Sequence, residues 1–390
     1  TNCKISGIPA KHLGKFGRID SVVFEDAYFS KRVLVTGHTG FKGGWLSHWL
    51  LSLGAEVCGF SLEPQSQDLL YGQLGLNNRI PYQVQGDIRD GVLLSKHIHK
   101  FEPDFVFHLA AQPLVRRSYE IPDETFEINV VGTVNLLQAL VGYKKPCAVV
   151  VVTSDKCYRD QETIDFYREE DPLGGHDPYS ASKACAELVV AAYRSSFFSG
   201  HGHLVRLASG RSGNVLGGGD WARDRIVPDI MRAVLAGDPI VVRNGKSTRP
   251  WQHVLEPLSG YLWLAAQMSR EEESSSSRES LCSAFNFGPQ RDHERTVLEL
   301  VETMIRHTGG DWIESSILSQ PHESANLRLA IDKAIRLLRW KPTWSFETCI
   351  SQTAAWYQSV HSGIDPVIAT DRSIRSYVDD AIRAEQAWAI

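Results

Sequence analysis

Apolar residues along this chain alternate between short continuous runs and stretches with helical spacing. Short runs bounded by turn residues indicate strands buried on both faces, as in a parallel sheet. We expect such strands at 31–37, 55–62, 103–111, 147–154 and 202–209. Helical spacing falls between them, most clearly at 45–54, 129–141 and 179–193. Strands alternating with helices predict βαβ units, and therefore an α/β fold with a doubly wound parallel sheet of the Rossmann type.

The alternation weakens after about residue 207, where helical stretches mix with short extended segments. We expect this part to form a smaller C-terminal α/β lobe that binds the substrate. The expected division is an N-terminal extension at 1–30, a dinucleotide-binding domain at 31–206 to which 255–288 returns, and a lobe made of 207–254 and 289–390. The low-complexity run at 271–280 predicts a surface loop.

Composition narrows the class of protein. The chain has 390 residues, of which 43% are hydrophobic and 22% charged, and a formal net charge of −5. A chain without a basic excess is not expected to bind nucleic acid, and no apolar run approaches the roughly 18 residues that span a membrane. The start of the chain lacks the pattern of a secretory leader. Seven cysteines lie far apart without a CxxC pair, which favours reduced thiols in the cytoplasm and no disulfide framework. No histidine spacing indicates a metal site.

A glycine-rich loop follows the first strand. Gly37, Gly40 and Gly43 form a GxxGxxG pattern between that strand and the next helix. Glycines there allow a tight turn and a close approach of a pyrophosphate, which the helix N-terminus then binds. In this context the loop predicts a dinucleotide cofactor, with His38, Thr39 and Phe41 also beside it. The alternative is an ordinary turn between a strand and a helix.

Other strand ends supply further candidates for the cofactor site. The second strand ends at Ser61 and not at the acid that usually binds the ribose, with Glu63 two residues later. The lack of a basic residue there favours NAD over NADP. Asp87 and Ile88 are placed to contact the adenine, although Asp87 could equally be a loop or cap residue. The remaining candidates for the cofactor site lie at the ends of the strands at 103–111 and 147–154 and on the helix at 179–193: Leu109, Ala110, Ala111, Gln112, Thr153, Tyr179 and Lys183.

The expected chemistry lies on the helix at 179–193 and at the end of the strand before it. Tyr179 and Lys183 are four residues apart and therefore share one helix face. A lysine near a phenol favours the phenolate, which can remove a proton from a sugar hydroxyl. A pair with this spacing can also be an ordinary surface pair, but here it accompanies the glycine-rich loop and a strand that ends at Ser154.

These features resemble the extended short-chain dehydrogenase/reductase superfamily over about residues 31–345. The resemblance rests on the glycine-rich loop and on the strings HLAAQ, TSDK, YSASK, RSGNVLGGGDW and TRPWQHV. The longer strings VTGHTGFKGGWL, TSDKCY and GGGDWARDRIVPD are similar in particular to those of the CDP-glucose 4,6-dehydratases, a group of lyases. The resemblance implies bound NAD and a nucleotide-sugar substrate, CDP-glucose, whose 4-keto-6-deoxy product serves deoxysugar biosynthesis.

In such dehydratases NAD takes a hydride from C4 and returns it to C6 after water has been lost across C5 and C6. The resemblance assigns Tyr179 to the 4-hydroxyl proton, Ser154 to the 4-oxygen and Asp155 to protonation of the departing 6-hydroxyl. Most relatives carry glutamate after this aspartate, whereas this chain has Lys156. Burial and neighbouring cations would favour the neutral amine that a base requires. The alternative is that Lys156 only pairs with Asp155.

The resemblance also implies residues on the substrate side. Arginine suits a diphosphate because its planar group binds phosphate oxygens in pairs. The candidates that bind substrate are His108, Arg116, Asn214, Trp221, Arg225, Arg243, Arg249 and Glu323. Each arginine could instead be a solvated surface charge, and His108 a structural histidine. In this superfamily the helices that correspond to 128–142 and 178–194 build a four-helix dimer interface, which implies a homodimer or homotetramer. These helices could also be buried within one subunit.

Two other functions stay open on the sequence. One is a 4,6-dehydratase or 4-epimerase that acts on another nucleotide sugar. An epimerase needs no acid and base after Ser154, so the presence of Asp155 and Lys156 argues against an epimerase. The other is a non-catalytic protein that senses dinucleotides, against which the intact Ser154, Tyr179 and Lys183 speak.

Overall fold

The computed structural model describes residues 22–64, 66–161, 166–199, 203–222, 225–270, 281–290, 294–314 and 328–390. Its centre is a parallel sheet with the strand order β11-β6-β5-β4-β1-β2-β3. The strands are β1 (Arg32–Thr36), β2 (Glu56–Ser61), β3 (Tyr82–Gln85), β4 (Phe105–His108), β5 (Cys147–Val152), β6 (Val205–Ser212) and β11 (Ala284–Phe287). This sheet confirms the predicted doubly wound α/β fold.

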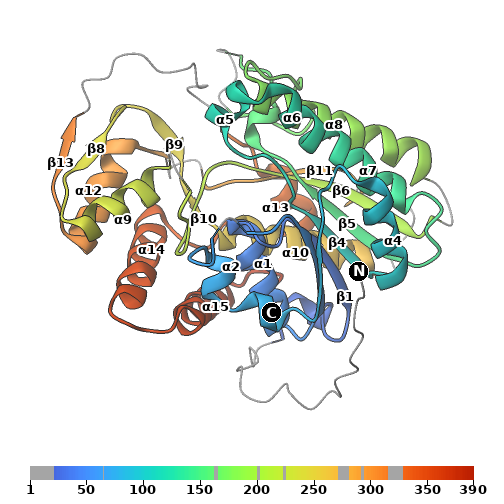
Figure 1. Cartoon of the computed structure of the whole chain (residues 1–390), viewed down its shortest axis with the longest axis horizontal. Coiled ribbons are helices and arrows are strands. Elements are labelled where there is room, and N and C mark those ends of the chain that lie inside the picture. Colours follow the sequence, from blue (N-terminus) through green and yellow to red (C-terminus); the bar gives the residue numbers. More distant parts are fainter. Residues whose placement is uncertain are drawn as a thin grey trace.

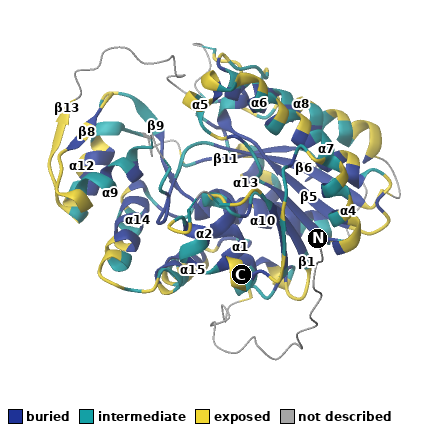
Figure 2. Ribbon diagram, viewed as in Figure 1, coloured by how far each residue is buried: buried dark blue, intermediate teal, exposed yellow. Residues whose placement is uncertain are grey.

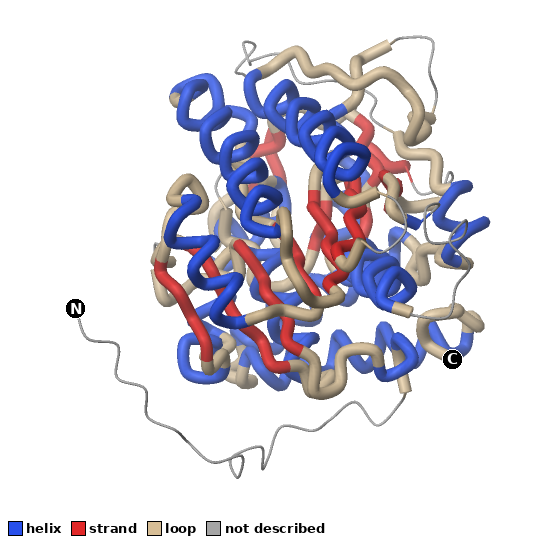
Figure 3. The backbone as a smooth tube through the Cα atoms, turned by 90° about the vertical axis from the view of Figure 1, so that its right-hand side faces the viewer, coloured by secondary structure: helices blue, strands red, loops and turns tan. Residues whose placement is uncertain are grey.

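Helices cover both faces of the sheet and make three layers (Figures 1 and 3). One face carries α4 (Gly91–Phe101), α5 (Val115–Glu120), α6 (Pro122–Phe126), the π-helical turn η2 (Glu127–Val131), α7 (Gly132–Leu140) and α8 (Pro178–Phe197). The other carries α1 (Phe41–Ser52), α2 (Leu70–Gln73), α3 (Leu76–Arg79), α10 (Leu255–Ser269), α13 (Asp332–Leu338) and α15 (Pro366–Arg383). Apart from the edge strand β3, the strands are largely buried between them, as apolar strands require (Figure 2).

A smaller group of elements lies at the left of Figure 1. It contains α9 (Ile226–Ala236), α12 (Val297–Thr308) and α14 (Phe346–His361). Its short strands pair as β7 (Val215–Leu216) with β10 (Gln252–His253), β8 (Ile240–Val242) with β13 (Trp312–Glu314), and β9 (Thr248–Pro250) with β12 (Glu294–Thr296). The division into two domains at the expected boundaries stays a prediction.

Strand order reverses between β1 and β4, which are neighbours in the sheet although β2 and β3 separate them in the chain. Ligands of such sheets bind at this switch point, beyond the carboxyl ends of the strands. Gly37 follows β1 there, and Leu109 and Ala110 follow β4. The fold therefore places the glycine-rich loop at the expected crevice.

The described part of the N-terminal segment is packed against the fold. Phe24 lies in the short 3-10 turn η1 (Phe24–Asp26), is fully buried and stacks on Trp388 with ring centres 5.0 Å apart. Tyr28 donates a hydrogen bond to the carbonyl of Leu262 at 2.6 Å. Residues 22–30, the described part of the predicted N-terminal extension, are therefore packed against the fold, and the residues before them lie outside the described ranges. None of the described helices combines the length and the apolar character needed to cross a membrane.

Candidate active site

The glycine-rich loop is crowded at two of its three glycines. Gly37 has a φ of +72°, and a Cβ there would lie 2.7 Å from the nitrogen of Ala110. A Cβ at Gly43 would lie 2.1 Å from the carbonyl oxygen of Gly37. At Gly40 the space is open, since its Cβ would meet only that same oxygen at 3.4 Å. Backbone atoms therefore pack closely against the loop at Gly37 and Gly43, and the side of the loop at Gly40 is accessible to a ligand.

The start of α1 fits an anionic group at that accessible side. Gly40 is the N-cap and supplies no capping side chain, so side chains do not satisfy the first N–H groups of the helix. A helix N-terminus in this state attracts a phosphate through its N–H donors and its dipole. Thr39 and Ser61 join their hydroxyls at 2.7 Å beside the loop. The residues present therefore fit the pyrophosphate and ribose of a dinucleotide.

We expect Gly43→Ala to weaken NAD binding by about tenfold or more, because the added carbon overlaps backbone and not a flexible side chain. Overpacking of this kind also lowers the free energy of unfolding by roughly 1–3 kcal/mol. Fluorescence titration with NAD and urea unfolding measure the two effects. The matched control is Gly44→Ala, where the new Cβ meets only the tip of the Leu70 side chain at 3.3 Å. Equal losses in the two variants would contradict the crowding argument.

The structure places other cofactor candidates in defined surroundings. Asp87 accepts hydrogen bonds from the Arg89 guanidinium, the closest at 2.6 Å, and these bonds lower the pKa of its carboxyl. Ile88 is buried against Gly132. His38 is buried, and its Nε2 lies 3.2 Å from the side-chain oxygen of Gln83. The expected adenine contact of Asp87 and Ile88 stays a prediction.

Two candidates make internal bonds that leave no free side-chain group. His108 is buried, with Nδ1 at 2.7 Å from the Thr36 hydroxyl and Nε2 at 3.3 Å from that of Thr133. Burial, and then the charge of Lys183, lowers its pKa to about 3. Gln112 bonds Thr125 and the backbone of Leu114 through its side chain. Both ring nitrogens of His108 and the side-chain amide of Gln112 therefore have partners within the protein, and the substrate contact of His108 and the cofactor contact of Gln112 stay predictions.

The catalytic candidates do come together where β5 ends. The 3-10 turn η3 (Asp155–Cys157) begins at Ser154, whose hydroxyl donates to the Asp155 carboxyl at 2.9 Å. That hydroxyl also accepts the backbone N–H of Lys156 at 3.2 Å. A side-chain hydrogen bond links Ser154 to Tyr179 at the start of α8. Asp155 is buried, which raises the pKa of its carboxyl against the charge of Lys156 and favours the protonated acid.

The tyrosine and lysine of α8 differ from the expected arrangement. Burial raises the pKa of Tyr179 to about 12, and the hydrogen bond between Tyr179 and Ser154 and the charge of Arg225 only partly oppose this rise. Lys183 points to the end of β5, where its Nζ donates to the carbonyl of Val152 at 3.3 Å. Burial lowers the pKa of Lys183 to about 8. The protein alone therefore does not hold Tyr179 as the phenolate that the lysine was expected to stabilise.

Three residues predicted to bind substrate, Arg225, Trp221 and Arg249, have defined surroundings in the structure. The charge of Arg225 lowers the pKa of Tyr179 and of Lys42, so Arg225 belongs to the catalytic cluster, and its Nη1 donates to Asp220 at 2.9 Å. Trp221 packs edge-on against Tyr357. Arg249 lies on β9, whose Pro250 is near Gly213 and Asp155.

The last four candidates lie on separate parts of the chain, one of them outside the described residues. Arg116 is exposed on α5, and Arg243 is exposed after β8. Asn214 is partly buried between β6 and β7. Glu323 lies outside the described residues. For all of these, substrate contact stays a prediction.

Three features of the site gave no signal in the sequence. Lys42, inside the glycine-rich loop, donates to the Ser212 hydroxyl at 2.8 Å. Behind the site, Glu187 on α8 accepts from Arg211 at 2.8 Å, from Ser209 at 2.8 Å and from Thr153 at 2.5 Å. Both members of this ion pair are almost fully buried. Asn129 in the π-helical turn joins Gln112 to Ser182 and so ties α8 to the end of β4.

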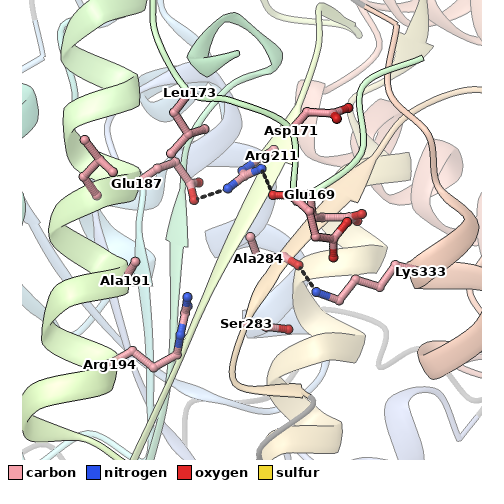
Figure 4. A pocket seen from close by; sticks show the side chains of 12 residues that line it. Glu169, Asp171, Leu173, Glu187, Ala191, Arg194, Arg211, Ser283, Ala284 and Lys333 are labelled. Carbon is pink, nitrogen blue, oxygen red and sulfur yellow. Dashed lines mark hydrogen bonds and ion pairs between the residues drawn. The ribbon is translucent and has the colours of Figure 1, made fainter. Parts of the chain in front are cut away.

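A cavity of about 480 Å³ lies on the far side of the pair formed by Glu187 and Arg211. Figure 4 shows Arg211 between Glu187 and the backbone of Glu169, with Arg194 at the lower left and Lys333 at the right of the cavity. The glycine-rich loop and the Ser154 turn do not contribute to its lining. No group of three or more side chains that could hold a metal ion occurs within the described ranges.

Comparison with known proteins agrees with this geometry. A family model described as GDP-mannose 4,6 dehydratase matches residues 34–353. The CDP-glucose 4,6-dehydratase of Salmonella typhimurium is 44% identical over 90% of this chain and 98% of its own. The dTDP-glucose 4,6-dehydratase DesIV of Streptomyces venezuelae, solved with NAD and TYD bound, superposes with a TM-score of 0.70 at 25% identity, over 86% of this chain and 99% of its own. The chain therefore belongs to the nucleotide-sugar 4,6-dehydratase family of the extended short-chain dehydrogenase/reductases.

Proposed function

We propose that this protein is a CDP-glucose 4,6-dehydratase that converts CDP-glucose to CDP-4-keto-6-deoxyglucose. The observation that carries the proposal is the buried Asp155, followed by Lys156 and linked through Ser154 to Tyr179. A buried acid beside an amine can donate one proton and accept another, which an elimination of water requires. The identity of 44% to a CDP-glucose 4,6-dehydratase supports the choice of nucleotide.

The residues of the chain divide the reaction between them. Tyr179 takes the proton of the 4-hydroxyl once it has itself lost its proton, because a pKa of about 12 makes the phenol its resting form, while Ser154 hydrogen-bonds the 4-oxygen. Lys156 takes the C5 proton, which the neighbouring ketone has made acidic. Asp155 gives its proton to the 6-hydroxyl as the bond to C6 breaks, so that water leaves. Burial raises the pKa of Asp155 and keeps this proton in place until it is needed.

NAD is the expected resident cofactor, and when bound it accepts the C4 hydride and later supplies it to C6. Gly37, Gly40 and Gly43 would hold its pyrophosphate against the start of α1, with Ser61 and Thr39 near the ribose. Lys183 faces the end of β5 beside the same crevice. A dehydratase solved with NAD bound supports this assignment.

Incubation with CDP-glucose, dTDP-glucose, UDP-glucose and GDP-mannose tests the function. Mass spectrometry should show loss of water with CDP-glucose, at a kcat/KM well above the other three. Dehydration of another sugar nucleotide with CDP-glucose untouched would overturn the choice of substrate. Inversion at C4 without loss of water would instead identify an epimerase.

We also propose that the protein forms a dimer through α7 and α8, in the cytoplasm. Leu188 on α8 is 58% exposed and Val131 before α7 is 47% exposed. Apolar residues of this size on neighbouring helices are typical of a helical interface. Five of the described cysteines are free thiols, as cysteines are in a reducing compartment: Cys58, Cys147, Cys157, Cys185 and Cys349.

Leu188→Asp is expected to shift the protein from dimer to monomer in sedimentation at micromolar concentration, because a charge enters an apolar interface. The control is Val92→Asp on α4, a residue that is 83% exposed. An unchanged sedimentation coefficient in Leu188→Asp would place the interface elsewhere.

A further inference from the structure

Lys42 brings a second amine to the catalytic cluster from an unexpected element. It is the second residue of α1 and lies within the glycine-rich motif. In such a motif, glycines and backbone N–H groups are expected to bind the ligand. Its Nζ donates to the Ser212 hydroxyl at the end of β6, 2.8 Å away. Tyr261 of α10 donates to the same oxygen at 2.8 Å, and its ring lies 6.0 Å from the amine. Three separate elements thus fix the position of the Lys42 amine.

Gly213, the residue after Ser212, lies against Asp155, which is the acid of the proposed reaction. A Cβ at Gly213 would lie 2.8 Å from Oδ2 of Asp155, so the backbone there packs directly on the carboxyl. The charge of Lys42 lowers the pKa of Asp155, and Asp155 in turn raises that of Lys42. Lys42 and Asp155 therefore lie beside two consecutive residues, Ser212 and Gly213, at the end of β6.

The Asp155 carboxyl also interacts with Lys156 on the η3 turn, Tyr179 on α8 and Tyr261 on α10. The Lys42 amine also interacts with Arg225 before α9 and Lys183 on α8. Burial, and then the charge of Arg225, lowers the pKa of Lys42 to about 7. A carboxylate formed at Asp155 would stabilise the charged amine, and the charged amine would stabilise the carboxylate.

We propose that Lys42 is a positioning residue for the dehydration: its ammonium group stabilises the carboxylate that Asp155 becomes when it protonates the departing 6-hydroxyl. This inference rests on the proposed function, in which Asp155 is the acid. Lys42 gains and loses no proton in the step. The proton passes from Asp155 to the oxygen of C6, the bond between C6 and that oxygen breaks, and water leaves as Lys156 takes the proton of C5. Oxidation at C4 does not use the Asp155 proton, so Lys42 should matter little there.

Lys42→Met keeps the length of the side chain and removes its charge. Without the cation the Asp155 carboxyl becomes a weaker acid, so the high-pH limb of dehydration should move up by about one pH unit. Dehydration should slow by roughly tenfold. Reduced cofactor should accumulate during turnover, because oxidation at C4 continues while elimination is delayed. Lys42→Arg should keep the wild-type limb, since it retains the charge.

Infrared titration of the resting enzyme supplies a readout that does not depend on turnover. The carbonyl band of protonated Asp155, identified by its absence in Asp155→Asn, should disappear about one pH unit higher in Lys42→Met. The matched control is Lys96→Met, an exposed lysine of α4. The inference would be overturned if Lys42→Met changed neither the high-pH limb of the dehydration rate nor the pH at which the Asp155 carbonyl band disappears. An equal loss of the rates of oxidation and elimination would also overturn it.

Asp155→Asn separates failure of the inference from failure of the proposed function. If Asp155→Asn dehydrates CDP-glucose at the wild-type rate, Asp155 is not the acid and both proposals lose this step. If Asp155→Asn blocks elimination while Lys42→Met behaves like Lys96→Met, only the role of Lys42 fails.

Discussion

Lys156→Met is expected to abolish exchange of the C5 proton of the substrate with solvent while oxidation at C4 continues. Lys156 lies directly after the buried acid, at the end of β5, and supplies the amine of the site that accepts the proton in the proposed reaction. Methionine has a similar length but cannot take up a proton. Loss of a general base lowers a rate by roughly 10²- to 10⁴-fold. Mass spectrometry of deuterium at C5 after incubation in heavy water, with cofactor absorbance recorded in parallel, measures both steps.

The matched control is Lys144→Met, at an exposed position before β5. It should exchange C5 at the wild-type rate. Persisting exchange in Lys156→Met would show that another group is the base and would leave Lys156 as a partner of Asp155. Loss of C4 oxidation together with exchange would show that the variant damages the whole site.

Glu187→Gln is expected to lower the free energy of unfolding by about 3–5 kcal/mol, because it leaves Arg211 buried without its anionic partner. Both side chains of the pair are at most 4% exposed. Urea unfolding monitored by tryptophan fluorescence measures the change. The matched control is Glu120→Gln, whose partner Arg117 is 52% exposed, and exposed pairs contribute roughly 1 kcal/mol or less. Equal effects in the two variants would contradict a role for burial.

The same pair predicts a dependence of stability on pH. Burial alone would raise the pKa of Glu187, but the charge of Arg211 and the hydrogen bonds from Arg211, Thr153 and Ser209 lower it. A depressed folded pKa means that the stabilisation is present above the ordinary pKa of glutamate and is lost as the pH falls through the folded pKa. Wild-type protein should therefore lose more stability on acidification than Glu187→Gln does.

The sequence predicts the part of this molecule that depends on local patterns. The valine-rich run before Ser154 predicts β5, and the spacing of Tyr179 and Lys183 predicts their shared face on α8, because strand and helix periods are properties of neighbouring residues. The three glycines predict the loop, since only they tolerate the close contacts between Gly43, Gly37 and Ala110.

Contacts between distant segments leave no such pattern. Glu187 and Arg211 lie on α8 and β6, and neither the period of the helix nor that of the strand indicates that they meet. His108 follows an apolar strand, like a pocket residue, but its ring turns to Thr36 on the neighbouring strand. Nothing in the sequence indicates a role for Lys42, because the glycines on both sides of it already account for the loop. Its partner Ser212 comes from a strand far along the chain.

The stacking of Phe24 on Trp388 has a consequence for how the chain folds. The ring of Phe24 also contacts Trp49, and Trp388 stacks on Tyr377, so one aromatic cluster joins segments from nearly opposite ends of the sequence. During synthesis Phe24 and Trp49 cannot form this cluster until the segment with Trp388 has been made. In contrast, β1 and the glycine-rich loop need only the first half of the chain. A chain that stops before Trp388 would therefore leave apolar rings exposed beneath an already formed cofactor loop, in a state prone to aggregation.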